Sequence, residues 1–334
     1  PPQHRQRRSK HDAVDWKRHL RVPFLHRMDT FIQQIINGLV LGSIYALVAL
    51  GYTMVYGILG LINFAHGEVV MIGALTALTV IKLLADSGLP GTVVVLIGLL
   101  AAVPVCMALG FTIERIAYRP LRNAPRLAPL ITAIGVSIVL QQLAMIFWGR
   151  NYHAFPPILP TSSREIGGAH ITDVQIVIIL LAVAIMAGLM LLVNRTRLGR
   201  AMRATAENPQ IAGLMGVNIN VIISATFLIG SALAAVAGVM VSANYSIAHY
   251  HMGFILGLKA FTAAVLGGIG NLPGAMLGGV LLGLIESLGA GYIGDLTGGF
   301  LGSHYQDVFA FFVLILVLVF RPSGLMGEKV AERA

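Results

Sequence analysis

The chain has 334 residues, of which 57% are hydrophobic and only 11% are charged, and its mean hydropathy is +0.82. Soluble domains carry roughly 25% charged residues, so a water-soluble fold of this size could not bury so much apolar side chain. The formal net charge of +9 gathers at one end, because residues 1–27 hold eight Lys or Arg against two Asp. The composition therefore excludes a water-soluble fold and indicates an integral membrane protein.

The basic segment 1–27 is predicted to be disordered. It has no apolar core and is too poor in apolar residues to be a signal peptide, and Met28-Asp29-Thr30 after it resembles a natural start. A basic arm that binds nucleic acid or anionic lipid is the alternative. We favour an upstream extension that is not native, and we expect no nucleic-acid partner.

Long apolar runs follow, each close to the roughly 20 residues that span a hydrocarbon core. They lack the period-two alternation of a barrel strand, so the predicted fold class is all-α, polytopic and membrane-embedded. The predicted spans are 31–52, 67–85, 92–113, 128–149, 174–193, 220–242, 254–270, 275–290 and 305–320. Residues 53–66 are apolar but interrupted by glycines, which predicts a short broken or re-entrant segment and leaves the count at eight to ten helices.

Arginine and lysine mark the cytoplasmic loops, because both resist translocation across the membrane. The basic positions are Arg115, Arg119, Arg122 and Arg126 in one loop, Arg195, Arg197, Arg200 and Arg203 in a second, and Arg321, Lys329 and Arg333 at the end. Within a membrane domain of residues 28–327, loop 194–218 is therefore predicted to be cytoplasmic, and 328–334 to be a cytoplasmic tail. Loop 149–173 has three prolines and few cations, so it is predicted to face outside.

The cytoplasmic loop 194–218 contains a stretch of good helix propensity, Leu198–Asn208, which is rich in Ala, Met and Arg. It predicts an amphipathic helix that lies on the membrane surface or docks into a groove of a partner.

Glycine-rich segments recur along the chain. Gly60–Gly67 resembles Gly268–Gly274, and each leads into an apolar helix, which is the pattern of an internal repeat around a transport path. The small-residue runs Gly230–Gly238 and Leu277–Gly283 predict close helix packing, with room for a narrow pore as the alternative.

Ionisable side chains inside apolar spans are costly and are therefore functional candidates. Glu68 opens one span beside Asn63 and His66, and we predict that it lies near the cytoplasmic side. Lys259 and Glu286 flank the Asn271 turn at equal distances along the chain, so a straight antiparallel hairpin would bring them together in the outer half of the membrane. Two roles remain open for this pair: a structural ion pair, or a lining of the solute path.

The sequence lacks motifs for nucleotide binding, catalysis or metal binding. It contains neither Gly-Lys-Ser/Thr, which cradles phosphates, nor His-Glu-x-x-His, and Cys106 is its single cysteine. His249 and His251 are predicted to lie in a loop or at the interface rather than at a metal. We therefore expect no catalytic residue, metal or cofactor on this chain, and any ATP must bind another chain.

Four sequence stretches together resemble the branched-chain amino-acid ABC transporter permeases, the Liv-type H subunits in particular. They are Leu39–Gly51, Ile62–Glu68, Arg197–Ala204 and Gly257–Ala275. The similarity covers Asp29 to Gly327, and the stretch from Lys259 to Ala275 is the most specific.

The resemblance implies a bacterial inner-membrane importer that works by alternating access and carries leucine, isoleucine or valine, with urea or short amides as other cargo. The implied partners are a second, Liv-type M permease, two cytoplasmic ATPases that use ATP and Mg, a periplasmic amino-acid-binding protein on loop 149–173, and membrane lipid. The residues implied to couple to the ATPases are Arg197, Gly199, Arg200, Arg203, Ala204, Ala206, Glu207 and Gly213. Their register is open, because the order Ala204-Thr205-Ala206-Glu207 departs from the Glu-Ala-Ala…Gly loop of other importer permeases.

A self-sufficient secondary transporter or channel is the competing interpretation, with Glu68, Lys259 and Glu286 as ion-coupling groups. A membrane-embedded enzyme ranks third, since the sequence offers no catalytic constellation.

Overall fold

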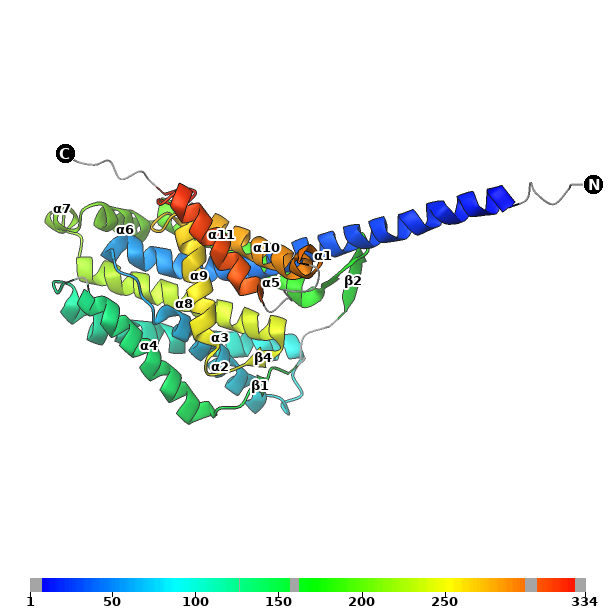
Figure 1. Cartoon of the computed structure of the whole chain (residues 1–334). Coiled ribbons are helices and arrows are strands. Elements are labelled where there is room, and N and C mark those ends of the chain that lie inside the picture. Colours follow the sequence, from blue (N-terminus) through cyan, green and yellow to red (C-terminus); the bar gives the residue numbers. More distant parts are fainter. Residues whose placement is uncertain (1–7, 126, 157–161, 298–304, 328–334) are drawn as a thin grey trace, which may run out of the picture.

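The computed structural model describes residues 8–125, 127–156, 162–297 and 305–327 and is almost entirely helical (Figure 1). The α-helices are α1 (Arg8–Leu59), α2 (His66–Leu83), α3 (Gly91–Ile113), α4 (Leu127–Trp148), α5 (Asp173–Arg195), α6 (Arg197–Glu207), α7 (Pro209–Leu214), α8 (Ile219–Tyr245), α9 (Met252–Gly267), α10 (Leu272–Leu296) and α11 (Gln306–Phe320). A π-helix (Glu114–Tyr118) and a 3-10 helix (Arg119–Leu121) extend α3. The predicted all-α membrane fold is confirmed.

Seven of the described helices are long and apolar enough to cross a membrane, and Met252–Gly267 and Ala310–Phe320 are shorter apolar helices. Their ends agree with most of the predicted spans to within a few residues, because long apolar runs define membrane helices directly. Arg126 and the tail 328–334, with Lys329 and Arg333, lie outside the described residues.

The first span differs from its prediction. The sequence predicted a broken or re-entrant segment at 53–66. Residues 53–59 are instead an unbroken part of α1, whereas after the turn at Gly60, whose φ is +63°, residues 60–65 do lead back into the bundle, so that His66 packs beside Gly51. Gly51, within the predicted span 31–52, serves close packing, since an added Cβ there would lie 2.2 Å from the His66 ring.

The basic segment also differs. Residues 8–27 are helical and continue α1 rather than being disordered, and Figure 1 shows this part projecting from the body of the molecule. A helix that is already anchored extends cheaply, because elongation adds one hydrogen bond for each residue that it orders.

Small residues bring the helices into backbone contact. An added Cβ at Gly283 of α10 would lie 2.2 Å from the Gly42 amide of α1, and one at Gly238 of α8 would lie 2.2 Å from the Val70 carbonyl of α2. The glycine runs are therefore packing faces, as predicted, and van der Waals contact between close backbones holds such helices together in lipid.

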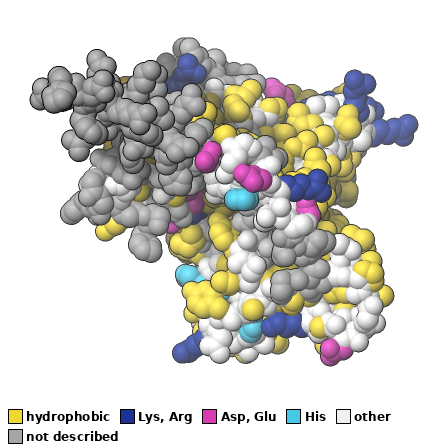
Figure 2. Space-filling view, turned by 90° about the vertical axis from the view of Figure 1, so that its right-hand side faces the viewer, with side chains coloured by type: hydrophobic (Ala, Val, Ile, Leu, Met, Phe, Trp, Pro, Cys, Tyr) yellow, Lys and Arg dark blue, Asp and Glu magenta, His cyan; other side chains and the backbone are white. Residues whose placement is uncertain are grey.

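The two ends of the bundle carry different elements. Helices α6 and α7 lie at one end in Figure 1, and the short strands lie at the other. There β1 (His153–Ala154) pairs antiparallel with β4 (Ile247–Ala248), and β2 (Ser163–Ile166) pairs antiparallel with β3 (Ala169–Thr172). Figure 2 views the strand end, where the charged side chains of the described residues are scattered among hydrophobic ones. The positive-inside rule predicts that this end, with α6 and α7, is cytoplasmic, and with α1 as one span Met28 would then begin on the opposite side.

Candidate translocation path

A cluster of charges links α9, α10 and α11 inside the membrane domain. Lys259 Nζ lies 2.7 Å from Glu286 Oε1 and 2.7 Å from Asp307 Oδ1. Glu286 is only 1% exposed, and its second oxygen accepts a 2.9 Å hydrogen bond from the Tyr45 hydroxyl of α1. The predicted approach of Lys259 and Glu286 is thus confirmed, and the cluster holds two carboxyl groups for one amine.

An open cavity of about 460 Å³ reaches this cluster from the strand end of the molecule. We call it the outer cavity. Its wall includes Tyr45, Tyr245, His249, His251 and Lys259. His249 packs against Tyr152 with ring centroids 4.2 Å apart, and its Nε2 lies 3.1 Å from the Arg150 carbonyl oxygen, so it has the loop role that the sequence predicted. A polar solute entering here would meet tyrosine hydroxyls and one charged amine.

Glu68 in the first turn of α2 is fully buried. Its Oε1 accepts hydrogen bonds from Ser137 (3.1 Å) and Gln141 (2.7 Å), whereas Oε2 has no hydrogen-bond partner in the described part of the chain. A buried carboxylate with a free oxygen is costly, and such groups mark solute or ion pathways in membrane proteins.

The depth of Glu68 corrects a prediction. Ser137 and Gln141 lie near the middle of α4, so Glu68 lies at mid-membrane rather than near the cytoplasmic side. The cause is the connection 60–65, which returns into the membrane before α2 begins: the His66 ring packs beside Gly51, roughly 12 Å of helix rise before α1 ends at Leu59.

A second cavity, of about 390 Å³, lies beside these groups. We call it the central cavity. Ser137 and Gln141 line it together with Tyr52, Phe64 and His251. His251 lines both cavities, so the two adjoin at this side chain.

Close packing of glycines positions the start of α2 against α9, which crosses α8 steeply in Figure 1. An added Cβ at Gly67 would lie 2.4 Å from the Gly253 carbonyl oxygen and 2.8 Å from the Gly257 Cα. Helix α9 therefore carries Lys259 and also walls in Glu68, so a shift of α9 would move both charged sites.

The other polar candidates have partners of their own. Asn63 accepts a 3.1 Å hydrogen bond from the Tyr118 hydroxyl, and His66 packs edge-on against Tyr52 with centroids 4.9 Å apart, its Nε2 without a hydrogen-bond partner in the described residues. Asn271 accepts from the Gly274 amide (2.9 Å) as the N-cap of α10, and donates to the Met326 carbonyl (3.0 Å). Asn271 thus fastens the cytoplasmic end of the hairpin to the segment after α11, away from both cavities.

The two glycine-rich segments that resemble one another do share a local role. Each is a turn before a helix, with a positive φ at Gly60, Gly268 and Gly270. Their asparagines act differently, because Asn271 caps a helix whereas α2 begins after Ala65 without a side-chain cap.

Helices α6 and α7 form a compact unit between α5 and α8. Thr196 caps α6 through the Gly199 amide (3.0 Å), and Arg203 donates to the Val193 carbonyl at the end of α5. Asn208 caps α7 by accepting from the Gln210 and Ile211 amides, both at 3.0 Å. Of the residues predicted to couple, Gly199 is buried, and the remaining seven are exposed: Arg197, Arg200, Arg203, Ala204, Ala206, Glu207 and Gly213.

Exposed apolar side chains lie together on α7 and at its C-terminal end. Leu214 is 87% exposed and Met215 is 81% exposed, beside an exposed Ile211. Apolar side chains that protrude together from a polar cytoplasmic loop mark a protein interaction site. We call Ile211, Leu214 and Met215 the α7 crown.

Sequence reasoning missed several residues of these sites. Tyr45 and Asp307 join the Lys259 cluster from α1 and α11, and nothing in the sequence shows that these helices flank the α9–α10 hairpin. Ser137 and Gln141 did carry a signal, because two polar residues spaced four apart in an apolar span share one helix face.

Comparisons with known proteins agree with this architecture. The family model described as "Branched-chain amino acid transport system / permease component" matches residues 34–318. The chain is 49% identical over 308 residues to the high-affinity branched-chain amino acid transport system permease protein BraD of Pseudomonas aeruginosa, covering 91% of this chain and 98% of that protein. It is 45% identical to LivH of Escherichia coli K12, a permease protein of the same description, over 91% and 97%.

More distant relatives match in part. The autoinducer 2 import system permease protein LsrC of Yersinia enterocolitica is 30% identical over 202 residues, which is 58% of this chain and 53% of that protein. No solved structure matches the chain.

Proposed function

Because the chain belongs to the permease component family of branched-chain amino acid transport systems, we propose that it forms half of the membrane channel of an ATP-driven importer of leucine, isoleucine and valine. It is a multi-pass protein of the bacterial inner membrane and a transport permease. The observation that carries the proposal is the match along nearly the whole length of two permeases whose names state this cargo. Relatives named for another cargo match over a shorter part of the chain.

The proposed assembly pairs this chain with a second, Liv-type M permease, two cytoplasmic ATPase subunits and a periplasmic amino-acid-binding protein. ATP and Mg bind the ATPases, and the binding protein docks on the loop 149–173. The α7 crown and the exposed arginines of α6 form the ATPase contact. The ATPases can drive transport through this surface only if they contact it differently in their two conformational states, because only a difference in contact energy shifts the conformation of the permease.

The proposed path runs from the outer cavity past His251 to the central cavity. Lys259 lines the outer cavity, where its amine is paired with Glu286 and Asp307, and the Glu68 carboxyl group stands behind the Ser137 and Gln141 wall of the central cavity. A zwitterionic amino acid would therefore first meet a cluster that offers partners to both its amino and carboxylate groups, and then an acidic group. Hydrocarbon walls from Phe64 and Leu258 suit an aliphatic side chain.

Reconstitution into vesicles tests the proposal. Leucine uptake is expected to require ATP inside, both ATPases and the binding protein outside, and leucine, isoleucine and valine should each stimulate ATP hydrolysis. Uptake by this chain alone under an ion gradient would instead establish the secondary transporter, with Glu68 and Lys259 as its coupling groups.

A further inference from the structure

A groove opens at the cytoplasmic end of the bundle, where α3 ends and α8 begins. Its volume is about 410 Å³. Arg115, Arg119 and Asn218 line its polar end, and Phe111, Val221 and Leu228 line its apolar part. Phe111 and Val221 are exposed, so this part of the groove faces outward from the bundle.

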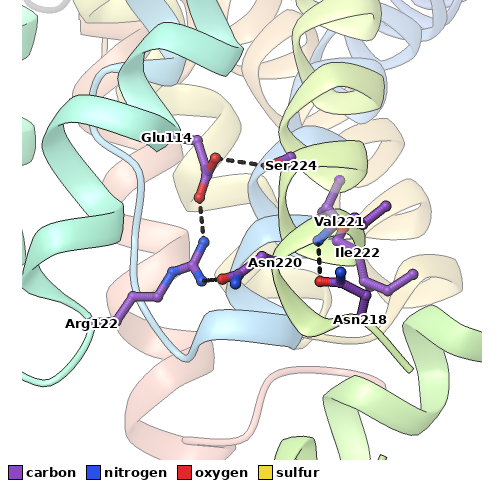
Figure 3. Close-up of polar contacts among 8 residues, drawn as sticks. Glu114, Arg122, Asn218, Asn220, Val221, Ile222 and Ser224 are labelled. Atoms are coloured by element: carbon purple, nitrogen blue, oxygen red, sulfur yellow. Dashed lines mark hydrogen bonds and ion pairs between the residues drawn. The ribbon is translucent and has the colours of Figure 1, made fainter. Parts of the chain in front are cut away.

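Figure 3 shows the polar wall behind this groove. Glu114 is fully buried and ion-paired with Arg122, and its second oxygen accepts a 2.8 Å hydrogen bond from Ser224 of α8. Arg122 also donates to Asn220 (2.6 Å). These contacts fix the end of α3 against the first turns of α8.

The polar end of the groove carries an excess of positive charge. Arg122 satisfies Glu114, whereas Arg115 and Arg119 form no ion pair with any acidic side chain in the described part of the chain. Burial lowers the pKa of the Arg122 guanidinium, and the nearby Arg119 lowers it further, while Glu114 opposes both effects. Three guanidinium groups against one carboxylate give the site a net charge of about +2.

The groove is polar at its cytoplasmic end and apolar deeper in the bundle. Arg115 and Arg119 lie at the cytoplasmic level, Phe111 is one turn deeper in α3, and Leu228 lies ten residues beyond the Asn218 cap, which is about 15 Å of helix. The α8 N-terminus at the polar end adds a partial positive charge. A ligand that fits must be anionic at one end and apolar along the other.

We propose that this groove binds an anionic phospholipid of the cytoplasmic leaflet, with its phosphate between Arg115 and Arg119 and an acyl chain along Phe111, Val221 and Leu228. Basic pockets between membrane helices on the cytoplasmic side suit such headgroups, and guanidinium binds phosphate with two parallel hydrogen bonds. The bound lipid would brace the start of α8, which directly follows α6 and α7.

Native mass spectrometry of the full chain in detergent tests the site, with phosphatidylglycerol and phosphatidylcholine as probes. The double variant Arg115→Gln/Arg119→Gln is expected to bind phosphatidylglycerol roughly 30-fold more weakly, since each arginine near an anionic headgroup contributes about 1 kcal/mol. The matched control Arg195→Gln/Arg321→Gln removes two exposed cytoplasmic arginines outside the groove and should bind as the parent does. Arg115→Lys/Arg119→Lys should retain most of the affinity, because the charge is kept, and an unchanged thermal unfolding of the Gln double variant excludes misfolding as the cause.

Three outcomes would overturn the proposal. They are equal affinity for phosphatidylcholine, an unchanged affinity in the Gln double variant, and displacement of the lipid by glycerol 1-phosphate, which would make the groove a site for soluble phosphate. In the assembled transporter, Val221→p-benzoylphenylalanine should cross-link to lipid on illumination. Cross-linking to the second permease instead would identify the groove as a subunit interface.

Discussion

Lys259 and Glu286 lie 27 residues apart in the chain, yet their side chains meet at 2.7 Å inside the membrane domain. The contact closes the α9–α10 hairpin, and Tyr45 ties it to α1. The pair therefore joins three helices, one of which also packs against the start of α2 beside Glu68. A structural role and a place on the proposed path are therefore two roles of this contact that stability and transport measurements must separate.

Breaking this pair should destabilise the protein strongly. Lys259→Met leaves the Glu286 carboxylate buried with Tyr45 as its remaining partner, and an uncompensated buried charge costs about 3–5 kcal/mol. Asp307→Asn should cost about 1 kcal/mol or less, because Asp307 is 41% exposed and its ion pair is screened. Thermal unfolding of the purified chain measures both, with Lys82→Met on the exposed part of α2 as the matched control.

The double change Lys259→Met/Glu286→Leu separates structure from transport. Removing both charges should restore most of the stability, since an apolar pair of similar volume replaces a buried ion pair at little cost. If uptake also recovers, the pair is structural; if the stable double variant fails to transport, the charges act on the solute. Normal uptake by both single variants would contradict either role.

Glu68 should be required for transport and not for folding. Glu68→Gln keeps the shape and an oxygen that can accept from Ser137 and Gln141, so stability should change by about 1 kcal/mol or less. Uptake is expected to fall at least about tenfold, because the acidic group behind the Ser137 and Gln141 wall of the proposed path is lost. Asp86→Asn, exposed in the α2–α3 connection, is the matched control. Unchanged uptake in Glu68→Gln would remove Glu68 from the path.

Much of the architecture was predictable because the membrane imposes simple rules. Apolar length determined the spans, arginine distribution determined the cytoplasmic loops, and the register of a hairpin placed Lys259 opposite Glu286. All three depend on residues near one another in the chain or on one local turn.

The remaining features depend on contacts between distant helices. Asp307 and Tyr45 belong to helices whose neighbours the sequence does not reveal, and Ser137 meets Glu68 only because α4 packs beside α2. Gly57 was misinterpreted as part of a break for the same reason: it lies inside α1, and an added Cβ there would lie 3.7 Å from the Gly270 carbonyl oxygen, a contact that no local pattern shows.

The basic extension 1–27 should be dispensable. Three spans separate it from the first basic loop, so its net charge of +6 would lie on the side where positive charge is disfavoured. A chain that starts at Met28 is expected to give the same membrane level and leucine uptake as the full chain in cells lacking their own transporter. A loss of insertion or uptake would show that the extension is a working part of the protein.

Changing the α7 crown should release the ATPases and leave the membrane domain intact. Leu214→Asp/Met215→Asp puts charge on two side chains that are more than 80% exposed, so folding should be unaffected, while docking into an apolar groove should weaken at least tenfold. Co-purification with the ATPases measures this, and Leu89→Asp, exposed in the α2–α3 connection, is the control. The sharper version deletes Arg200 to Met215: normal assembly and import after that deletion would refute the proposed coupling role.

Gly199 and Gly213 offer a matched pair for testing how the coupling unit is held. An added Cβ at Gly199 would lie 2.2 Å from the Val193 carbonyl oxygen and 2.4 Å from that of Leu192, both backbone atoms that cannot yield without moving α6 away from α5. At Gly213 the nearest atom is a side-chain carbon at 4.0 Å. Gly199→Ala should therefore cost about 1–3 kcal/mol as an overpacked contact, whereas Gly213→Ala should be neutral or slightly stabilising, since alanine favours helix by about 1 kcal/mol.

Because α6 carries the arginines of the proposed ATPase contact, Gly199→Ala should also lower the number of leucine molecules imported per ATP hydrolysed. The measurement is this ratio in each of the two variants, and a lower ratio in Gly199→Ala alone would show that coupling depends on the packing of α6 against α5. Equal ratios would show that this packing has no part in coupling.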